Sequence, residues 1–260
     1  MTNPTNFQNS DATSICHLAL ETIGKGGSIA ILSGESPIWS RAVGTDRRAA
    51  ADLAVQLDEA MRFLHQQELH LGCLSVAIGP GSFTGLRIAV TTAKTLAYAL
   101  DLPIIPVGAL AAIAVALPRP AKAHRTLVGL NAYRGQVFSA AFSDDELQSG
   151  ASSDWNGRAD LIERSTWDSE AAAALAAGGQ VICEPAITPR ESDGPDSGHL
   201  VALDGGVNLA VGVGIAANRL RGAELPNAGH RSDNVPYESA FALAPRYIKL
   251  SAAEEKAAER

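Results

Sequence analysis

The amino-acid sequence predicts an α/β protein of two lobes, each with a mixed β-sheet and flanking helices. Strand and helix patterns alternate in the order β-β-β-α-β-α-β up to residue 107, and a weaker round of similar kind follows. The run CLSVAIG (73–79) is apolar throughout, as expected for a strand buried on both faces of a sheet. The 260 residues are enough for one large domain or two small ones.

The first part of the chain predicts three strands followed by a helix. The apolar runs 14–22, 28–34 and 37–43 are separated by tight turns, which indicates an antiparallel meander. Leucines and a methionine then recur at helical spacing over 46–67. Asp46 is placed to cap this helix.

A glycine-rich turn leads from the strand at 73–79 into a second helix. The turn has the sequence GPGSFTG (79–85), and a helix-like stretch comes directly after it. Ser82 or Thr84 is placed to cap that helix, because a short hydroxyl side chain can accept a bond from a free N–H in the first turn. The apolar run 102–107 predicts the next strand.

A second round of elements follows. The runs 126–132 and 135–143 predict a hairpin, 165–178 a helix, 180–184 a short strand and 202–222 a further helix. A repeated β-β-β-α-β-α pattern is the way the actin-like (ASKHA, ribonuclease-H-like) superfamily is built. This likeness concerns the fold alone, since one fold supports many chemistries.

The element order also predicts the domain organisation. We expect a flexible leader (1–13), a first actin-like lobe with the glycine-rich turn (14–108), and a second, degenerate actin-like lobe with the C-terminal segment (109–250). A flexible tail is expected at 251–260. The stretch 188–198 is rich in Pro, Gly and Asp and predicts an exposed loop.

Composition argues against a main nucleic-acid-binding surface and against a membrane span. The formal net charge is -7, whereas a chain that grips nucleic acid alone needs a basic face. No apolar run reaches the ~18 residues needed to cross a bilayer. The three cysteines, Cys16, Cys73 and Cys183, form no paired framework, so we expect a reduced, cytoplasmic setting. The polar start of the chain predicts no signal peptide.

The glycine-rich turn matches no phosphate-binding or nucleophile motif. Free N–H groups at a helix start attract anions. Thr84, however, stands where Walker A and Rossmann loops need glycine, and no lysine follows it. Pro80 stands where a nucleophile elbow needs glycine before its serine. The residues alone leave two interpretations open, a tight strand-to-helix turn and an anion site.

Other candidates for chemistry are few. The six histidines include no HxxxH or HExxH pair, so we expect ordinary surface or core histidines and no metal site. Glu21 ends the first strand, and actin-like ATPases use an acid there to help place magnesium and phosphate. Glu21 and Thr22 are therefore candidates for a vestigial phosphate turn; the alternative for Glu21 is a strand-end carboxylate bonded to the turn.

Small residues form a stripe along the helix after the glycine-rich turn. Ala89, Ala93 and Ala97 lie four apart and make a flat surface that another helix can approach closely. Two interpretations carry equal weight: packing against the first helix of the chain, or a subunit interface.

Five segments carry a resemblance to a known family. GPGSFTGLRIAVTTAKTLA (79–97) closely resembles the signature of the TsaB (YeaZ) family, partner proteins of bacterial tRNA threonylcarbamoyladenosine synthesis. Four more segments resemble further parts of this family in the same order: LALETIGKGGSIAIL (18–32), DLPIIPVGALAAIA (101–114), LNAYRGQVFSAAF (130–142) and APRYIKL (244–250).

The resemblance implies a two-lobed actin-like fold and an essential, non-catalytic role. TsaB-like proteins pair with the catalytic paralogue TsaD, which modifies the adenosine beside the anticodon, and the ATPase TsaE joins the complex. The resemblance therefore implies a TsaD-like subunit and a TsaE-like ATPase as partners, a homodimer when the chain is isolated, and contact with tRNA only through the complex. It implies no tightly bound cofactor for the chain alone, with ATP or ADP and magnesium in the complex. TsaD-like chains carry a His-x-x-x-His motif that this sequence lacks, which favours the partner over the enzyme.

The resemblance also implies which residues serve the partner surface. The signature loop and interface helix supply Gly79, Pro80, Gly81, Ser82, Phe83, Thr84, Gly85, Leu86, Arg87, Ala89, Ala93 and Ala97, and the first helix supplies Leu53 and Leu57. The stretch GTDRRAAA (44–51) replaces the Arg-His-Ser-type sequence usual before the first helix of this family.

Two other classes of function compete with this role: an enzyme, either a kinase or a peptidase, and a scaffold for a different protein. An actin-like small-molecule kinase needs a second phosphate loop, for which LDGGVN (203–208) is the one candidate in the sequence. A peptidase needs a metal or nucleophile set, and no motif recommends one. A scaffold for a different protein, such as an acetyltransferase, is not separated from the TsaD partner by the sequence.

Overall fold

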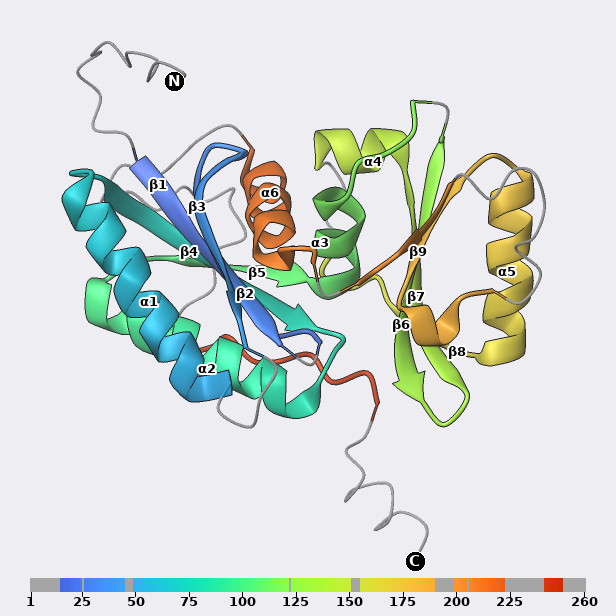
Figure 1. The fold of residues 1–260 in the computed structure, drawn as a ribbon, viewed down its shortest axis with the longest axis horizontal. Coiled ribbons are helices and arrows are strands. Elements are labelled where there is room, and N and C mark those ends of the chain that lie inside the picture. Colours follow the sequence, from blue (N-terminus) through green and yellow to red (C-terminus); the bar gives the residue numbers. More distant parts are fainter. Residues whose placement is uncertain are drawn as a thin grey trace, which may run out of the picture.

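Two five-stranded mixed β-sheets form the two lobes of the protein, with helices beside and between them (Figure 1). This arrangement confirms the predicted α/β fold class. The computed structural model describes residues 15–24, 26–44, 49–121, 123–150, 155–189, 199–204, 206–222 and 241–249. The predictions for the leader, the tail and the Asp46 cap, and most of that for the loop at 188–198, lie outside the described residues.

The first sheet has the strand order β3-β2-β1-β4-β5. Its strands are β1 (Ile15–Glu21), β2 (Gly27–Ser33), β3 (Ser36–Val43), β4 (His70–Gly79) and β5 (Ile104–Gly108). Antiparallel pairing of β1 with β2 and of β2 with β3 confirms the predicted meander. Parallel pairing joins β1 to β4 and β4 to β5, and the central strand β4 is buried along most of its length.

Two long helices, α1 (Ala49–Gln66) and α2 (Phe83–Leu100), cover one face of this sheet (Figure 1). Alternation along β1 decides which residues meet them: Leu18 and Leu20 point to the cluster under α1 and α2, whereas Ala19 points to the opposite face. Both helices were predicted from their apolar periodicity.

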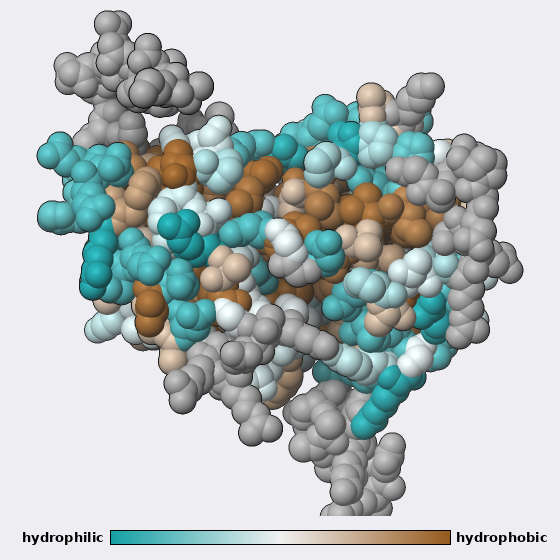
Figure 2. All heavy atoms as spheres, viewed as in Figure 1, coloured by the Kyte–Doolittle hydropathy of each residue, from teal (hydrophilic) through white to brown (hydrophobic). Residues whose placement is uncertain are grey.

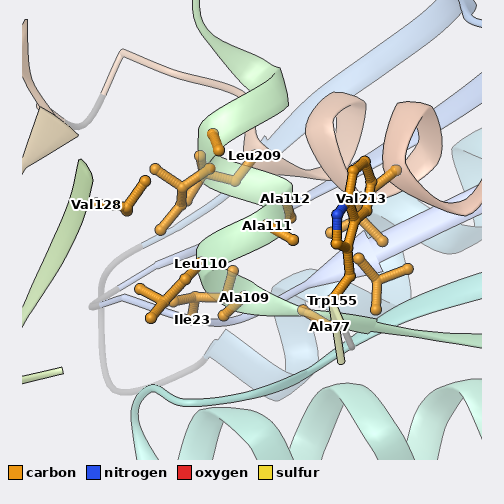
Figure 3. Close-up of a cluster of buried hydrophobic side chains, with 14 of the residues drawn as sticks. Ile23, Ala77, Ala109, Leu110, Ala111, Ala112, Val128, Trp155, Leu209 and Val213 are labelled. Carbon is orange, nitrogen blue, oxygen red and sulfur yellow. The ribbon is translucent and has the colours of Figure 1, made fainter. Parts of the chain in front are cut away.

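The opposite face of the first sheet is covered by helices that also reach the second lobe. These are α3 (Ala109–Ala116), which is buried almost all round, and α6 (Leu209–Arg221). Figure 3 shows α3 between Val128 of the second sheet and Val213 of α6, within a cluster of buried side chains that both lobes share. A Cβ at Gly212 would collide with the Ala112 carbonyl, which shows how closely α6 approaches α3.

The helix α6 comes from the part of the chain assigned to the second lobe, yet it packs on β1 and β2 of the first. The predicted lobe boundaries themselves stay a prediction. In the view of Figure 2, apolar side chains gather across the middle of the molecule, over α6, α3 and the neighbouring second sheet. Within the described ranges, no helix combines the length and apolar character that crossing a membrane requires.

The second sheet has the strand order β10-β9-β6-β7-β8. Its strands are β6 (Arg125–Tyr133), β7 (Gln136–Ser143), β8 (Asp160–Glu163), β9 (Gln180–Cys183) and β10 (Leu200–Ala202). The antiparallel pairing of β6 with β7 confirms the predicted hairpin. The strands β8 and β10 were not predicted, because runs of 4 and 3 residues are too short to show a period of two.

Shorter helices complete the second lobe: α4 (Asp144–Ser149), α5 (Arg164–Ala176) and the 3-10 turn Pro185–Ile187. Trp167 of α5 is fully buried against the sheet, where its ring occupies the space that a Cβ on Gly129 would fill. The six-residue α4 was not predicted, although Ser143 and Glu146 give it a complete capping box.

Candidate functional site

A cleft of about 1630 Å³ lies between the lobes. Residues from both lobes line it, and they come from segments far apart in the sequence. The main segments are the β1–β2 turn (21–24 and 26–28), the glycine-rich turn (80–83), the β6–β7 hairpin (130–134), the segment leading into α6 (203–204 and 206–209) and the C-terminal segment (246–249). The structure therefore brings together four of the five segments that carry the resemblance to the TsaB family, all but 101–114.

The glycine-rich turn packs directly on the turn after β1. The Ser82 N–H donates to the Ile23 carbonyl at 2.9 Å, and the Thr22 hydroxyl donates to the Gly85 carbonyl. A Cβ at Gly81 would lie 2.9 Å from the Ile23 carbonyl oxygen, and one at Gly85 would collide with the Thr22 carbonyl. Both glycines are required by this close approach of two backbones.

Gly79, at the start of the turn, meets a different segment. Its φ of +117° lies in the region that only glycine adopts readily, and its peptide bond to Pro80 is cis. A Cβ there would lie 2.7 Å from the Arg246 carbonyl oxygen. The Arg246 N–H in turn donates to the Ile78 carbonyl at 2.7 Å. The C-terminal segment is therefore packed against the beginning of the glycine-rich turn.

The start of α2 is capped from within the chain. Ser82 is the N-cap, and its hydroxyl oxygen accepts a bond from the Gly85 N–H at 3.3 Å. The Leu86 N–H donates to the Ser82 carbonyl at 2.8 Å. The N–H groups of Ser82, Gly85 and Leu86 are thus already bonded. The structure shows the tight strand-to-helix turn, and the anion site stays a prediction.

Glu21 is buried at the floor of the cleft and bonded on both carboxyl oxygens. One oxygen accepts the Ile23 N–H at 2.8 Å, and the other accepts the Ser28 hydroxyl. The Ser28 oxygen also accepts the Ala210 N–H at 2.9 Å, from the first turn of α6. Burial raises the pKa of Glu21, an effect that the two hydrogen bonds to its carboxyl group oppose. This is the predicted alternative for Glu21, a strand-end carboxylate that holds its own turn.

The residues expected to form a partner surface on the first two helices are core. Each of six side chains is at most 9% exposed: Leu53, Leu57, Leu86, Ala89, Ala93 and Ala97. They belong to the cluster of buried side chains between these helices and the first sheet. The prediction that these side chains contact a partner is therefore wrong. Small residues on α2 allow the helix to lie close to β4, which is the close approach that the stripe indicated.

The outward face of α2 carries a different set of residues. Arg87 and Thr91 are exposed there, and Tyr98 is 71% exposed. Thr84 is also exposed, in the first turn of the helix. Periodicity in the sequence divided the helix into two faces, but it did not show which one the sheet would cover.

Phe83 and Arg87, both predicted site residues, meet a C-terminal side chain. The rings of Phe83 and Tyr247 have centroids 4.5 Å apart, and the Arg87 guanidinium lies 4.2 Å from the Phe83 centroid. The Arg87 Nε donates to the Tyr247 hydroxyl at 3.1 Å. The sequence contained Tyr247 within a family-like segment, but no local pattern linked it to α2.

The second lobe contributes one wall of the cleft, including Glu184, which the sequence did not single out. Glu184 follows β9 and accepts the Asn131 N–H at 2.6 Å, while the Asn131 side chain accepts the Tyr133 N–H at 2.9 Å. Tyr133 has a φ of 59° and is 67% exposed at the end of the β6–β7 hairpin. In the loop considered for a second phosphate site, the Asp204 carboxylate accepts the Gly206 N–H at 3.2 Å.

A buried polar group lies apart from the cleft, between the first sheet and α6. The Arg221 guanidinium contacts the Cys73 sulfur at 3.6 Å and also donates to the Asn218 side chain. Burial lowers the pKa of His17 to about 3, with a contribution from the charge of Arg221, and burial raises that of Cys73 to about 11. In the part of the chain that the structure describes, no three His, Cys, Asp or Glu side chains are grouped to hold a metal ion.

Comparison with known proteins finds sequence matches to TsaD and TsaB proteins. The family model described as TsaD, tRNA N6-adenosine threonylcarbamoyltransferase, matches residues 45–154. A curated relative from Escherichia coli (strain K12), tRNA threonylcarbamoyladenosine biosynthesis protein TsaB, is 38% identical over 76 residues, which cover 29% of this chain and 33% of the relative. The protein of the same name from Bacillus subtilis (strain 168) is 43% identical over 77 residues, covering 28% and 31%. The matches span about a third of the length of these relatives.

Solved structures agree with the fold. YeaZ from Pseudomonas aeruginosa superposes with a TM-score of 0.60 at 20% identity, covering 90% of this chain and 100% of that one. A second structure, described as an uncharacterized protein with similarity to peptidase YEAZ from Pseudomonas aeruginosa, gives 0.57 at 21% identity with the same coverage. At these identities the structures support the two-lobed fold alone. Together with the curated relatives of the signature region, they show that this chain is similar to TsaB and YeaZ proteins.

Proposed function

We propose that this chain acts in the biosynthesis of threonylcarbamoyladenosine on tRNA, as a non-catalytic partner that activates a TsaD-like transferase. The proposal extends to a TsaE-like ATPase in the same complex, to tRNA contact only through the complex, and to a cytoplasmic setting. It is supported by the names of the curated relatives, which match about a third of their own length, and by the family model for TsaD.

The observation that carries the non-catalytic role is the use of the signature loop for internal packing. Gly81 and Gly85 accommodate the backbone of the β1–β2 turn, and Gly79 accommodates the Arg246 carbonyl. The Ser82 hydroxyl caps α2. These residues therefore shape the first lobe and its junction with the C-terminal segment, and the N–H groups of Ser82 and Gly85 are bonded within the chain.

The turn after β1 does not fit a magnesium–phosphate site. Both Glu21 carboxyl oxygens accept hydrogen bonds from Ile23 and Ser28, and burial favours the protonated acid, which is a poor ligand for a hard cation. The proposed function therefore places no nucleotide at this turn. ATP or ADP with magnesium is proposed for the complex, at an interface shared with the partner.

The partner surface is proposed on the outward face of α2, in place of its buried stripe. Tyr98 and Leu100 are 71% and 40% exposed on this helix, and the neighbouring Phe241 is 79% exposed. Large apolar side chains at the surface are typical of protein–protein contacts. The same face is proposed to pair with a second copy when the chain is isolated.

The test is reconstitution with the TsaD-like subunit of the same organism. Co-purification and size-exclusion chromatography, with and without ATP, are expected to give a defined complex. Threonylcarbamoyl transfer to tRNA is expected only when both proteins are present. Absence of a complex under every nucleotide condition would contradict the partner role and leave a scaffold for another protein, such as an acetyltransferase, or an actin-like kinase as the alternatives. Tight magnesium-dependent ATP binding by the isolated chain would favour the kinase.

The match to the TsaD family model favours one second candidate, a transferase that is itself catalytic. The same reconstitution separates it from the partner role. Transfer by the isolated chain, supplied with tRNA and the threonylcarbamoyl adenylate, would support the catalytic candidate. Transfer only in the presence of the TsaD-like subunit would support the partner.

A further inference from the structure

The C-terminal segment 241–249 has no helix or strand, yet it contacts both lobes along its length. Its residues bond to α2, to the end of β4, to the loop before β8 and to the β6–β7 hairpin. In Figure 1 it runs beneath the first sheet toward the second lobe. We call residues 241–249 the strap.

The strap begins on the outward side of α2. The Lys94 ammonium donates to the Leu243 carbonyl at 2.8 Å and to the Phe241 carbonyl at 3.4 Å. The Leu243 side chain is 1% exposed and joins the cluster under α2. The rings of Tyr98 and Phe241 meet edge to face at 5.7 Å. The start of the strap is therefore held by groups that lie at the surface of this helix.

The middle of the strap connects the two lobes through one residue. The Arg246 backbone N–H donates to Ile78 at the end of β4, in the first lobe. The Arg246 guanidinium donates to the Asn156 carbonyl at 2.5 Å, in the loop between α4 and β8. Asn156 also bonds to β5, since its side chain accepts the Gly108 N–H and donates to the Pro106 carbonyl, both at 2.9 Å. Arg246 thus ties the strap to the junction of the lobes.

The end of the strap reaches the second lobe. The Lys249 ammonium donates to the Ala132 carbonyl at 3.0 Å, on the β6–β7 hairpin that lines the cleft. Ile248 packs against the cluster that both lobes share. Arg246, Tyr247, Ile248 and Lys249 all line the cleft. The same short segment therefore touches the surface of α2 at one end and both walls of the cleft at the other.

The two connections between the lobes differ in kind. The helices α3 and α6 lie between the sheets and close a dry apolar cluster, which resists separation because opening it exposes apolar surface to water. Beside the packing of Ile248, the strap reaches the second lobe through two charged side chains bonded to carbonyls. Water can replace such hydrogen bonds at a small net cost. The shared cluster is therefore suited to act as a hinge between the lobes, and the strap is suited to detach from the second lobe.

We propose that the strap sets the width of the interlobe cleft and couples it to the outward face of α2. Displacement of Lys94 or Tyr98 at that face shifts residues 241–243, and this shift is passed along the strap to Arg246 and Lys249. The coupling extends the proposed function, since a protein bound on that face would contact the strap. The strap itself is a property of the isolated chain, so it is tested without any partner.

The test measures the separation of two labels across the cleft. Ala42 and Ala186 are exposed, line the cleft and lie on different lobes, so Ala42→Cys and Ala186→Cys place one label on each wall. The native cysteines Cys16, Cys73 and Cys183 are buried and do not compete in the folded protein. Distance distributions from spin labels are then compared between the full chain and strap variants made in the doubly labelled background.

The first variants remove the bonds to the second lobe. Arg246→Met and Lys249→Met keep the aliphatic length of each side chain and delete its charge. We expect a longer mean separation between the labels in both variants. In Arg246→Met, hydrogen exchange of the backbone amide at position 246 is expected to be roughly tenfold faster, as for the loss of one hydrogen bond to a charged group. The matched control is Arg41→Met, since Arg41 also lines the cleft but bonds to Ser40 and Glu59 in its own lobe.

The second variants test the coupling from the helix surface. Lys94→Met and Tyr98→Ala are expected to lengthen the same separation, although neither residue lines the cleft, while Thr91→Ala on the same face is expected to leave it unchanged. A separation that stays the same in Lys249→Met and in Lys94→Met overturns the proposal. If Arg246→Met does not fold, Lys249→Met decides, because it leaves the Arg246 bonds in place. Failure to bind a TsaD-like protein would overturn the proposed function and would not change this result.

Discussion

Thr22 and Gly85 are 63 residues apart in the chain, yet the Thr22 hydroxyl donates to the Gly85 carbonyl and the Thr22 carbonyl occupies the space that a Gly85 Cβ would fill. The contact fastens the turn after β1 to the first turn of α2. It explains why the signature sequence needs glycine at this point of a helix, where alanine is otherwise the better residue.

Gly85→Ala is expected to destabilise the fold by about 1–3 kcal/mol, because the added methyl group overlaps the Thr22 carbonyl and forces the two turns apart. Urea unfolding followed by circular dichroism measures the change. Gly24→Ala is the control, since nothing lies within 4 Å of a Cβ at Gly24. Equal, small effects for both variants would show that the turns are not packed as described.

Ala93→Arg is expected to unfold the isolated chain, because Ala93 is fully buried on the face of α2 that packs on the first sheet, and an unpaired buried charge costs on the order of 3–5 kcal/mol. Thr91→Arg, on the exposed face of the same helix, is expected to leave the fold intact. Thermal melts of the two variants separate the outcomes. A folded Ala93→Arg chain that has lost only its partner would restore the original interface prediction.

The burial of His17 is expected to make the fold less stable in mild acid. Its pKa is lowered to about 3 in the folded chain from an ordinary value of 6.5, so the unfolded state binds the proton first as pH falls. The wild-type free energy of unfolding is expected to fall by roughly 2 kcal/mol between pH 6.5 and 5 through this group. His17→Gln should flatten the decline, and His65→Gln, an exposed control on α1, should not. An equal decline in all three proteins would contradict the burial of a neutral His17.

The burial of Glu21 is expected to give the free energy of unfolding the opposite dependence on pH. Because its pKa is raised above 4.5 in the folded state, that state binds the proton more tightly, and stability due to this group is lost as pH rises from 4.5 through the raised pKa. Glu21→Gln, which keeps the shape of the neutral acid, should therefore gain stability relative to wild type as pH rises through that range. Chemical unfolding at a series of pH values tests this. A constant difference between the two proteins would indicate that Glu21 is not desolvated.

The local pattern of the sequence determined most of the first lobe and the hairpin of the second. Long apolar runs such as 73–79 predict buried strands, because few other structures bury every side chain in a row. Ser82 was predicted as one of two possible caps, since the cap depends on residues within one turn of helix. The signature segment also carried the resemblance to TsaB proteins, and the comparisons find similarity to proteins of that name.

Only the tertiary structure decided which surfaces these elements share. Periodicity shows that Ala89, Ala93 and Ala97 lie on one face of a helix, but a flat face packs equally well on a sheet of the same chain or on another protein. From the sequence, Glu21 could serve a phosphate turn or bond to its own turn. The tertiary structure places Ser28 and the first turn of α6 beside it, and the Ser28 hydroxyl bonds to the Glu21 carboxylate. The contacts of Arg246 with Ile78 and Asn156 join positions up to 168 residues apart, and no local pattern contains them, because they depend on how the whole chain returns across the cleft.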